Sequence, residues 1–305
     1  MKKCLAALLE QTYPKEQYEV IVVSDGPDAE TEVVVKGIHA NGIAVSLIQL
    51  DENKGPAAAR NAGWLSARGA TIAFTDDDCL PDKNWLAEIA VNIDPEKKEA
   101  VTGNIVVPRS KHPTDYELNI SHLETAEFVT ANCACTRAAL IATGGFDERF
   151  RMAWREDSDL HFKLISQDIP VTYLSSATVV HPVRDPQWGI SLKEQKKTLF
   201  NALLYQKYPK LYRDRIQPLP PVLYYLIIAA FAVMLTGLFG GDMRLFKAGA
   251  TGWVLLTLYF TFQRLRQTSR SISHVVEMAC TSFVIPFLSV YWQWYGAFRY
   301  RVFFI

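Results

Sequence analysis

The sequence predicts an α/β domain followed by a hydrophobic helical segment that associates with a membrane. In the first part of the chain, short β-branched runs alternate with helical patterns of apolar residues. Three long stretches beyond residue 215 contain no charged side chain, namely 216–241, 248–263 and 278–298. We therefore divide the chain into a domain at 1–215 and a membrane-associated segment at 216–305.

Charge is distributed unevenly between these two parts, although the net charge of the chain is zero. Basic residues outnumber acidic ones by seven to two in 216–305, which leaves the first 215 residues acidic on balance. This distribution argues against nucleic acid as a partner and suits an anionic membrane surface. The five cysteines form no C-x-x-C pair, which predicts reduced thiols in a cytosolic domain.

Strands and helices alternate in the first half of the domain. The predicted strands are 18–23, 45–50 and 70–75, and the predicted helices are 4–9 and 56–68. Pro56 and Gly69 bracket the second helix, as proline and glycine commonly do. Apolar strands separated by helices imply a parallel sheet with both faces covered, and such sheets bind ligands beyond the carboxyl ends of their strands.

The alternation continues in the second half of the domain. We expect a strand at 100–107 and a helix at 137–143 that ends at Gly144. A further helix is predicted at 156–166, and a last strand at 171–180 that ends at His181.

Carboxylates follow two of the predicted strands. Asp76, Asp77 and Asp78 come directly after the run 70–75, and adjacent carboxylates repel one another unless a cation lies nearby. Their oxygens suit Mg²⁺ or Mn²⁺, ions that usually also hold substrate phosphates. A solvated acidic turn is the alternative. For Asp25, which follows the first strand, the residues alone favour a simple turn.

Four further residues are candidates for a role in chemistry. Glu156 and Asp157 open a predicted helix, where acids commonly complement the helix dipole but can also act as a general base. Arg60 could contact a phosphate, although a surface helix residue is the commoner case. His181 ends a strand at the expected ligand edge, where a structural histidine is the alternative.

Together these features resemble glycosyltransferase family 2, whose members have the GT-A fold, a Rossmann-like domain that binds nucleotide-sugars. The resemblance covers residues 1 to about 185 and rests on motifs that stand in the family's order. These motifs are 11–14 with 18–26, then 53–61, 74–78, 144–148 and 156–160.

The resemblance implies roles for individual residues. Asp25 would bind the nucleobase, Asp76 would lie toward the ribose, and Asp78 would hold Mn²⁺ or Mg²⁺. Asp157 would be the catalytic base of an inverting transfer, with Glu156 beside it. We add Arg60, Asp77 and Asn132 to the donor-binding set and His181 to the metal ligands.

The chain also departs from the family pattern at its start. Relatives begin with an apolar strand that lies in the middle of the sheet and lines the nucleobase pocket, and this chain starts directly with the following helix. Removing a central strand leaves the backbone groups of its neighbours unpaired. We therefore expect a domain that lacks this strand to fold poorly and to bind its donor weakly.

Three other activities compete with the transfer of a single sugar. A nucleotidyltransferase of similar fold would carry a Gly-rich loop with a basic residue near its N-terminus, and none is present. A processive polysaccharide synthase would carry a Q-x-x-R-W motif, which is also absent. A non-catalytic scaffold has no need of Asp76, Asp78 and Asp157 together.

We favour a uridine diphosphate sugar as donor, and a membrane lipid or a lipid-linked glycan of the cell envelope as acceptor.

The final segment is predicted to contain membrane helices at about 221–240, 246–263 and 275–298. The basic loop from Arg264 to Arg270 should face the cytosol, and so should Arg299 and Arg301. Both can do so if the third helix is interfacial or re-entrant, and Pro286 makes a break in that helix plausible. This places the catalytic domain on the cytoplasmic side of the cell membrane.

Overall fold

The computed structural model describes residues 1–304 and divides into two compact units. Unit 1 comprises Met1–Pro108 and Ser121–Val183, and unit 2 comprises Arg109–Ile120 and Arg184–Ile305. The division therefore falls at 183/184 rather than at the expected 215/216. A short segment from the middle of the α/β part also belongs to the second unit.

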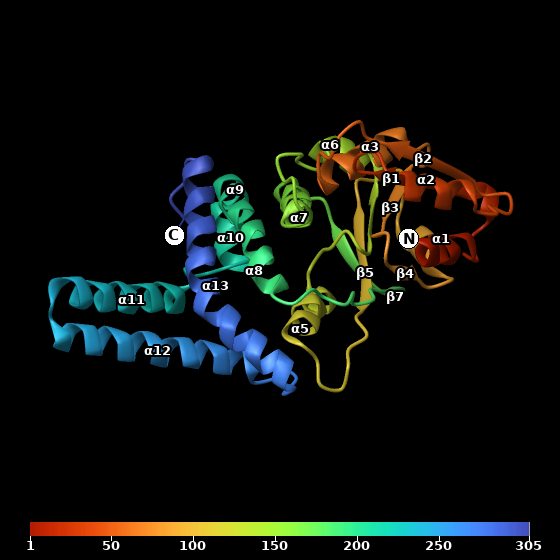
Figure 1. Cartoon of the computed structure of the whole chain (residues 1–305). Helices are drawn as coiled ribbons and strands as arrows, with labels where there is room; N and C mark the ends of the chain where they lie inside the picture. Colours follow the sequence, from red (N-terminus) through yellow and green to blue (C-terminus); the bar gives the residue numbers. More distant parts are fainter. Residues whose placement is uncertain (305) are drawn as a thin grey trace. The chain divides into compact units, whose positions relative to one another are not determined.

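Unit 1 contains an interrupted mixed sheet with helices around it (Figure 1). Its strands are β1 (Glu19–Ser24), β2 (Ala44–Gln49), β3 (Thr71–Phe74), β4 (Leu80–Pro81), β5 (Ala100–Val106), β6 (Cys133–Thr136) and β7 (Val171–Val180). Its helices are α1 (Lys2–Leu9), η1 (Lys15–Gln17), α2 (Ala29–Lys36), α3 (Pro56–Ser66), α4 (Trp85–Asn92), η2 (His122–Thr125), α6 (Arg137–Thr143) and α7 (Glu156–Ser166).

The expectation of a wholly parallel sheet was wrong. β1 and β2 pair in parallel, but the five-stranded sheet has the order β3-β6-β5-β7-β4, and only β5 and β7 are parallel in it. The short strand β6, which the sequence pattern did not reveal, lies antiparallel between β3 and β5. β3, β5 and β7 run in the same direction, and only the short strands β6 and β4 run against their neighbours, so these two strands are the physical reason for the difference.

The sheet is divided between β1 and β3. In the described chain β1 pairs only with β2, and β3 pairs only with β6, so each strand has one edge without a strand partner. Separate hydrophobic clusters lie beneath the two sheets. Leu140, Leu160 and Leu164 belong to the larger one, whereas Leu5 and Val20 belong to a smaller one around β1. Our expectation about a central strand stays a prediction.

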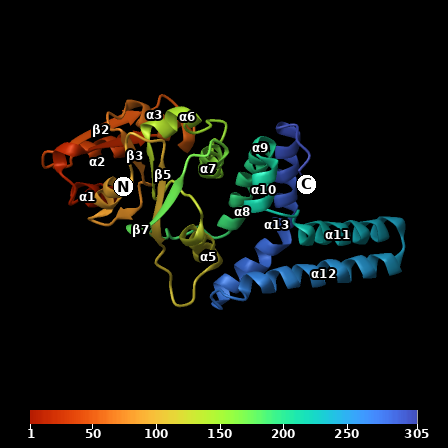
Figure 2. The ribbon, with the colours of Figure 1, turned by 180° about the vertical axis from the view of Figure 1, so that it is seen from behind.

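Unit 2 is entirely helical in the part of the chain that the structure describes. It contains most of α5 (Asp115–Ser121), α8 (Ile190–Glu194), η3 (Gln195–Thr198), α9 (Leu199–Lys207), α10 (Pro209–Arg215), α11 (Val222–Gly240), α12 (Met243–Leu265) and α13 (Ile272–Arg299). α11 and α12 lie side by side as an antiparallel hairpin in both views, and α13 crosses its open end (Figures 1 and 2). Asp242 begins α12 by accepting hydrogen bonds from the amides of Arg244 and Leu245.

Three helices are therefore long and apolar enough to cross a membrane, as the sequence predicted. They are Val222–Gly240, Met243–Leu265 and Ile272–Arg299.

Candidate active site

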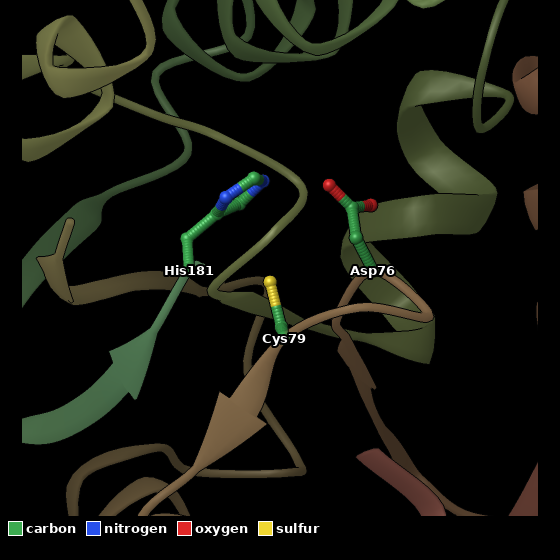
Figure 3. A group of neighbouring side chains, drawn as sticks. All are labelled: Asp76, Cys79 and His181. Atoms are coloured by element: carbon green, nitrogen blue, oxygen red, sulfur yellow. The ribbon is translucent and has the colours of Figure 1, made fainter. Parts of the chain in front are cut away.

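The end of strand β3 and the end of strand β7 meet in a cluster of possible metal ligands. Asp76 follows β3, His181 follows β7, and Cys79 precedes β4. One ligand atom from each lies within 4.8 Å of the others, and the three side chains converge in Figure 3. His181 therefore lies beside Asp76 at this edge, whereas Asp78 does not belong to the group, and the assignment of His181 as a metal ligand stays a prediction.

The three side chains offer an oxygen, a nitrogen and a sulfur atom to a divalent ion. A carboxylate suits either kind of ion, but imidazole and thiol are ligands for transition metals, whereas Mg²⁺ prefers oxygen. Cys79 is fully buried, and this burial together with Asp76 raises the pKa of its thiol far above the ordinary value. Because the thiolate rather than the thiol binds a metal, this rise makes Cys79 a poor ligand, and the group does not distinguish between the two ions that the sequence suggested.

Arg60 on α3 joins this cluster to the acids at the start of α7. Its guanidinium donates from Nη2 to Asp76 Oδ1 at 2.8 Å and from Nη1 to Glu156 Oε1 at 2.9 Å. Its side chain is only 17% exposed, so both ion pairs are shielded from water. Arg60 is thus not a loose surface side chain, because it fixes the distance between two acidic motifs.

Glu156 and Asp157 have unusual proton affinities for carboxylic acids. Burial and the neighbouring Asp157 raise the pKa of Glu156 to about 7, although Arg60 opposes the rise. Glu156 Oε2 is also buried, without a hydrogen-bond partner among the described residues. Burial likewise raises the pKa of Asp157, whose Oδ1 accepts the Ser158 amide at 2.6 Å. Raised pKa values in a pair of adjacent acids are typical of sites that transfer protons.

The backbone at this point is held in an unfavourable conformation. Arg155, which immediately precedes the two acids, has φ 76°, in the left-handed region that non-glycine residues rarely adopt. Its guanidinium lies over the ring of Trp154, 4.6 Å from the centroid. Backbone strain of this kind persists only where the surrounding structure stabilises it, and strained residues are common at functional sites.

Asp25 closes the loop that leads into α3. Its carboxylate accepts the amides of Lys54 and Gly55 at 2.6 and 2.9 Å. Gly55 has φ +95°, and a Cβ there would lie 2.7 Å from the backbone of Arg151, so only glycine fits. Asp25 therefore stabilises this loop through its carboxylate, as a simple turn residue would. Its role in nucleobase binding stays a prediction.

Asn61 ties the motif at 53–61 to the motif at 144–148. Its side chain donates to the carbonyl of Phe146 and to Glu148 Oε1, and it accepts the amide of Phe146, all at 2.9 Å. It also accepts the indole N–H of Trp64. Two motifs that lie far apart in the sequence are therefore parts of one rigid support beneath the site.

A comparison with known protein families identifies the domain that contains these motifs. Residues 1–151 match the family model of glycosyl transferase family 2. The N-terminal half of the chain is a glycosyltransferase family 2 domain.

The curated relatives that match are named glycosyltransferases, and they are longer than the matched regions. Glycosyltransferase AglE from Haloferax volcanii is 36% identical over 105 residues, which are 34% of this chain and 34% of that protein. A pre-mycofactocin glycosyltransferase from Mycobacterium tuberculosis is 30% identical over 182 residues, 54% of this chain and 37% of that protein. The chain thus spans about a third of the length of these relatives.

A solved structure confirms the predicted GT-A fold of the family 2 domain. It is the mannosyltransferase PcManGT from Pyrobaculum calidifontis in complex with GDP-Man and Mn²⁺. The TM-score is 0.58 at 20% identity, over 93% of this chain and 83% of that chain.

Within the family 2 domain, Asn132 has a structural role. It is 1% exposed, its amide donates to the carbonyls of Asn104 and Ala177, and its oxygen accepts the indole N–H of Trp85. These bonds use the two N–H groups of its side chain and engage its oxygen. We therefore leave Asn132 out of the donor-binding set that the sequence suggested.

Sequence reasoning missed Cys79 as a member of the cluster at the strand edge. Its position directly after the acidic triplet was the only available signal, and a lone cysteine is far more often a packing residue. Asp77 is exposed and Asp78 is half-buried, and neither belongs to the group of converging ligand atoms.

Proposed function

We propose that this protein is a metal-dependent, inverting glycosyltransferase that moves a sugar from a uridine diphosphate sugar to an acceptor hydroxyl. The observation that carries the proposal is the bridge formed by Arg60 between Asp76 and Glu156. It joins the acidic motif of the donor side to the acidic pair of the acceptor side. A single displacement needs these two sides at a fixed distance, because the leaving and attacking groups lie on opposite faces of one carbon.

Asp157 is the general base of this reaction. Its carboxylate takes the proton from the acceptor hydroxyl as the oxygen attacks the anomeric carbon. The raised pKa increases its affinity for that proton at neutral pH. Glu156 is a positioning residue, because its ion pair with Arg60 fixes the first turn of α7.

The donor lies along the edge formed by the ends of β1, β3 and β7. Asp25 contacts the nucleobase, Asp76 lies toward the ribose, and Asp78 and His181 hold Mn²⁺, with Arg60 and Asp77 near the diphosphate. When bound, the ion neutralises charge on the leaving nucleoside diphosphate. Support comes from the convergence of Asp76 and His181 and from the structural neighbour, which binds GDP-Man and Mn²⁺.

The acceptor is a membrane lipid or a lipid-linked glycan of the cell envelope. The apolar helices of unit 2 support this choice, because they would hold the enzyme at the bilayer surface. The loop between α12 and α13 carries Arg266 and Arg270, and basic loops remain preferentially in the cytoplasm. We accordingly place the catalytic domain on the cytoplasmic side of the cell membrane.

Binding calorimetry tests the donor site. The detergent-purified protein is titrated with the diphosphates of uridine, guanosine, cytidine and adenosine, with and without Mn²⁺. Uridine diphosphate should bind only with Mn²⁺, and Asp78→Asn should abolish this binding. Asp82→Asn, an exposed acid just past β4, is the matched control and should bind as the unaltered protein does. Binding that is independent of metal, or unchanged in Asp78→Asn, contradicts the proposal.

Product analysis separates the competing activities. A glycosyltransferase releases nucleoside diphosphate, whereas release of pyrophosphate would identify a nucleotidyltransferase. One sugar added per acceptor supports single transfer, and a growing polymer would indicate a processive synthase. Turnover should be lost in Asp157→Asn while nucleoside diphosphate binding is kept.

A further inference from the structure

Helix α13 presents a stripe of apolar side chains outward. Along one stripe, Phe298 is 74%, Tyr291 56% and Val276 49% exposed. The opposite stripe is buried against the rest of unit 2 and combines the apolar Met278 and Ile285 with small or polar residues: Thr281, Ser282, Ser289, Gln293 and Gly296. A helix surrounded by water carries polar side chains on its exposed face, and this stripe does not. The outward stripe therefore faces an apolar medium.

The C-terminal half of α13 nevertheless cannot cross the centre of a bilayer. η3 and α9 pack along it, and a Cβ at Gly296 would lie 2.3 Å from the carbonyl oxygen of Leu199. These packed helices are charged: Lys196 lies over the ring of Trp292, and Lys197 pairs with Glu194 at 2.6 Å. Each such charge costs about 3 kcal/mol or more at the centre of a membrane.

The N-terminal half of α13 also packs against polar groups. Arg264, at the end of α12, donates to Thr281 Oγ1 at 2.7 Å and to Ser282 Oγ at 3.1 Å. The same guanidinium pairs with Asp115 at 2.8 Å. With 28 residues, α13 is about 42 Å long, well above the roughly 30 Å of the hydrocarbon core.

The α11–α12 hairpin, unlike the helices around α13, is apolar along most of its length. It carries no charge along α11 or along 248–263, and only 11% of the apolar window of α11 is buried. α11 has 19 residues, so it is about 28 Å long and matches the hydrocarbon core. The charges of the hairpin lie at its ends, with Asp242, Arg244 and Lys247 at the tip and Arg264 at the open end. A tip with three charges must reach the polar region on the far side of the bilayer.

We propose that α11 and α12 cross the membrane as a hairpin, while α13 lies along the membrane surface on the side of α8–α10. Its outward stripe, which includes Val276, Phe283, Tyr291, Tyr295 and Phe298, sits at the boundary between headgroups and acyl chains. Tyrosine and tryptophan side chains favour this depth. The partner of the stripe is the lipid surface, so α13 is a platform beside the membrane rather than a third span.

A depth measurement along α13 tests this arrangement. Cys280 is the only exposed cysteine of the five in the chain, so Cys280→Ala supplies a background for labelling. In that background Val276→Cys, Val284→Cys, Tyr291→Cys and Phe298→Cys each carry a fluorophore, in the full chain reconstituted into phosphatidylcholine–phosphatidylglycerol vesicles. Quenching by lipids that are spin-labelled at different depths locates each position.

We expect all four labels at a similar shallow depth, within about 5 Å of one another, as for a helix that lies in the interface. A spanning helix would instead place position 284 near the bilayer centre and positions 276 and 298 near opposite surfaces. That result would overturn the proposal. Labels that no lipid quencher reaches would overturn it as well, because the stripe would then face protein or water.

Labelling from each side of the membrane gives an independent test of the topology. Gly240→Cys at the tip, Gln267→Cys before α13 and Phe303→Cys after it are treated with an impermeant maleimide in sealed vesicles of either orientation. No atom lies within 4 Å of a Cβ at Gly240, so this variant should fold. Positions 267 and 303 should react from one side, and position 240 from the other. Reaction of 267 and 303 from opposite sides would show that α13 spans.

Discussion

At the scale of single residues, Arg60 is the contact on which the site depends most. Replacing it with methionine leaves the buried carboxylate of Glu156 without a counter-charge, because Arg60 is its ion-pair partner at 2.9 Å. We expect Arg60→Met to destabilise the domain by about 3 kcal/mol and to lower kcat by about 100-fold. Denaturant unfolding and steady-state kinetics measure the two effects.

Arg68 provides a matched control for this substitution. It also pairs with a glutamate, Glu19, but its side chain is 77% exposed. Arg68→Met should change stability by less than about 1 kcal/mol and leave kcat unaltered, because exposed ion pairs contribute little. Equal losses in the two variants would show that the bridge to Glu156 has no special role.

Glu156 should also make stability depend on pH. Its pKa in the folded protein is about 7, above the ordinary value of 4.5, so the folded state holds the proton more tightly than the unfolded state. The contribution of Glu156 to the free energy of unfolding should therefore be greatest below pH 4.5 and should fall as pH rises toward 7. The change is on the order of 3 kcal/mol. Glu156→Gln, compared with the unaltered protein in denaturant titrations from pH 5 to 8, should flatten this dependence; identical slopes would contradict it.

The sequence could identify these residues as candidates for the site, but it could not predict their contacts. Asp76, Glu156 and Arg60 were identified from motifs, yet Arg60 and Glu156 are separated by 96 positions, and no local pattern reveals an ion pair at that distance. The convergence of His181 with Asp76 and Cys79 depends likewise on how β7 lies against β4 and β5. Roles that follow from tertiary pairing remain hidden until the fold is known.

At the scale of elements, long apolar runs were predictable and short ones were not. The strands at β1, β2, β3, β5 and β7 were all expected close to where they lie. β6 consists of the four residues Cys133–Thr136, too few for an alternating pattern to show. β4 has only two residues and includes Pro81. Such strands exist because neighbouring strands supply their hydrogen bonds, which is information that a local window does not contain.

Two glycines allow the close approach of α11 and α12. A Cβ at Gly249 would lie 2.3 Å from the backbone nitrogen of Met234, and one at Gly237 would lie 2.2 Å from that of Phe246. Small residues that let backbones meet are the usual basis of helix packing in membranes. Gly249→Val should therefore separate the helices and lower the thermal midpoint of the protein in detergent by several degrees, about 1–3 kcal/mol of overpacking.

Gly252 lies on the same helix and serves as the control. A Cβ there would lie 3.6 Å from the Cβ of Ala230, an ordinary contact, so Gly252→Ala should keep or slightly raise the midpoint. A midpoint for Gly249→Val that matches Gly252→Ala would mean that the hairpin is looser than the structure indicates. A close backbone contact between two helices cannot be inferred from the sequence of either helix alone.

At the scale of the whole molecule, the sequence predicted two parts, and the two compact units of the structure divide the chain at other positions. The prediction assumed that each part is one continuous stretch of chain. Segment 109–120 lies between two strands of the α/β part in sequence, yet its contacts are with the helices of unit 2. The responsible contacts include the ion pair of Asp115 with Arg264 and the bond from the Ser269 amide to the carbonyl of Pro113. The two units are therefore joined by three crossings of the chain rather than one.

The ion pair between Asp115 and Arg264 should hold segment 109–120 in place. The Arg264 side chain is 8% exposed and that of Asp115 is 29% exposed, so the pair is largely shielded from water. Asp115→Ala should free the segment, and trypsin should then cleave after the exposed Lys111 about tenfold faster, which corresponds to about 1.4 kcal/mol. Asp94→Ala, which removes an exposed acid paired with Lys97, should leave this cleavage unchanged.

A double-mutant cycle shows whether the effect passes through the ion pair. In the Arg264→Met background, Asp115→Ala should accelerate cleavage after Lys111 little further, because the partner is already gone. Fully additive rates would mean that other contacts hold the segment. Because 109–120 is continuous with β5 on one side and with η2 on the other, a coupled result would make this pair the contact that holds the segment between these two elements within unit 2.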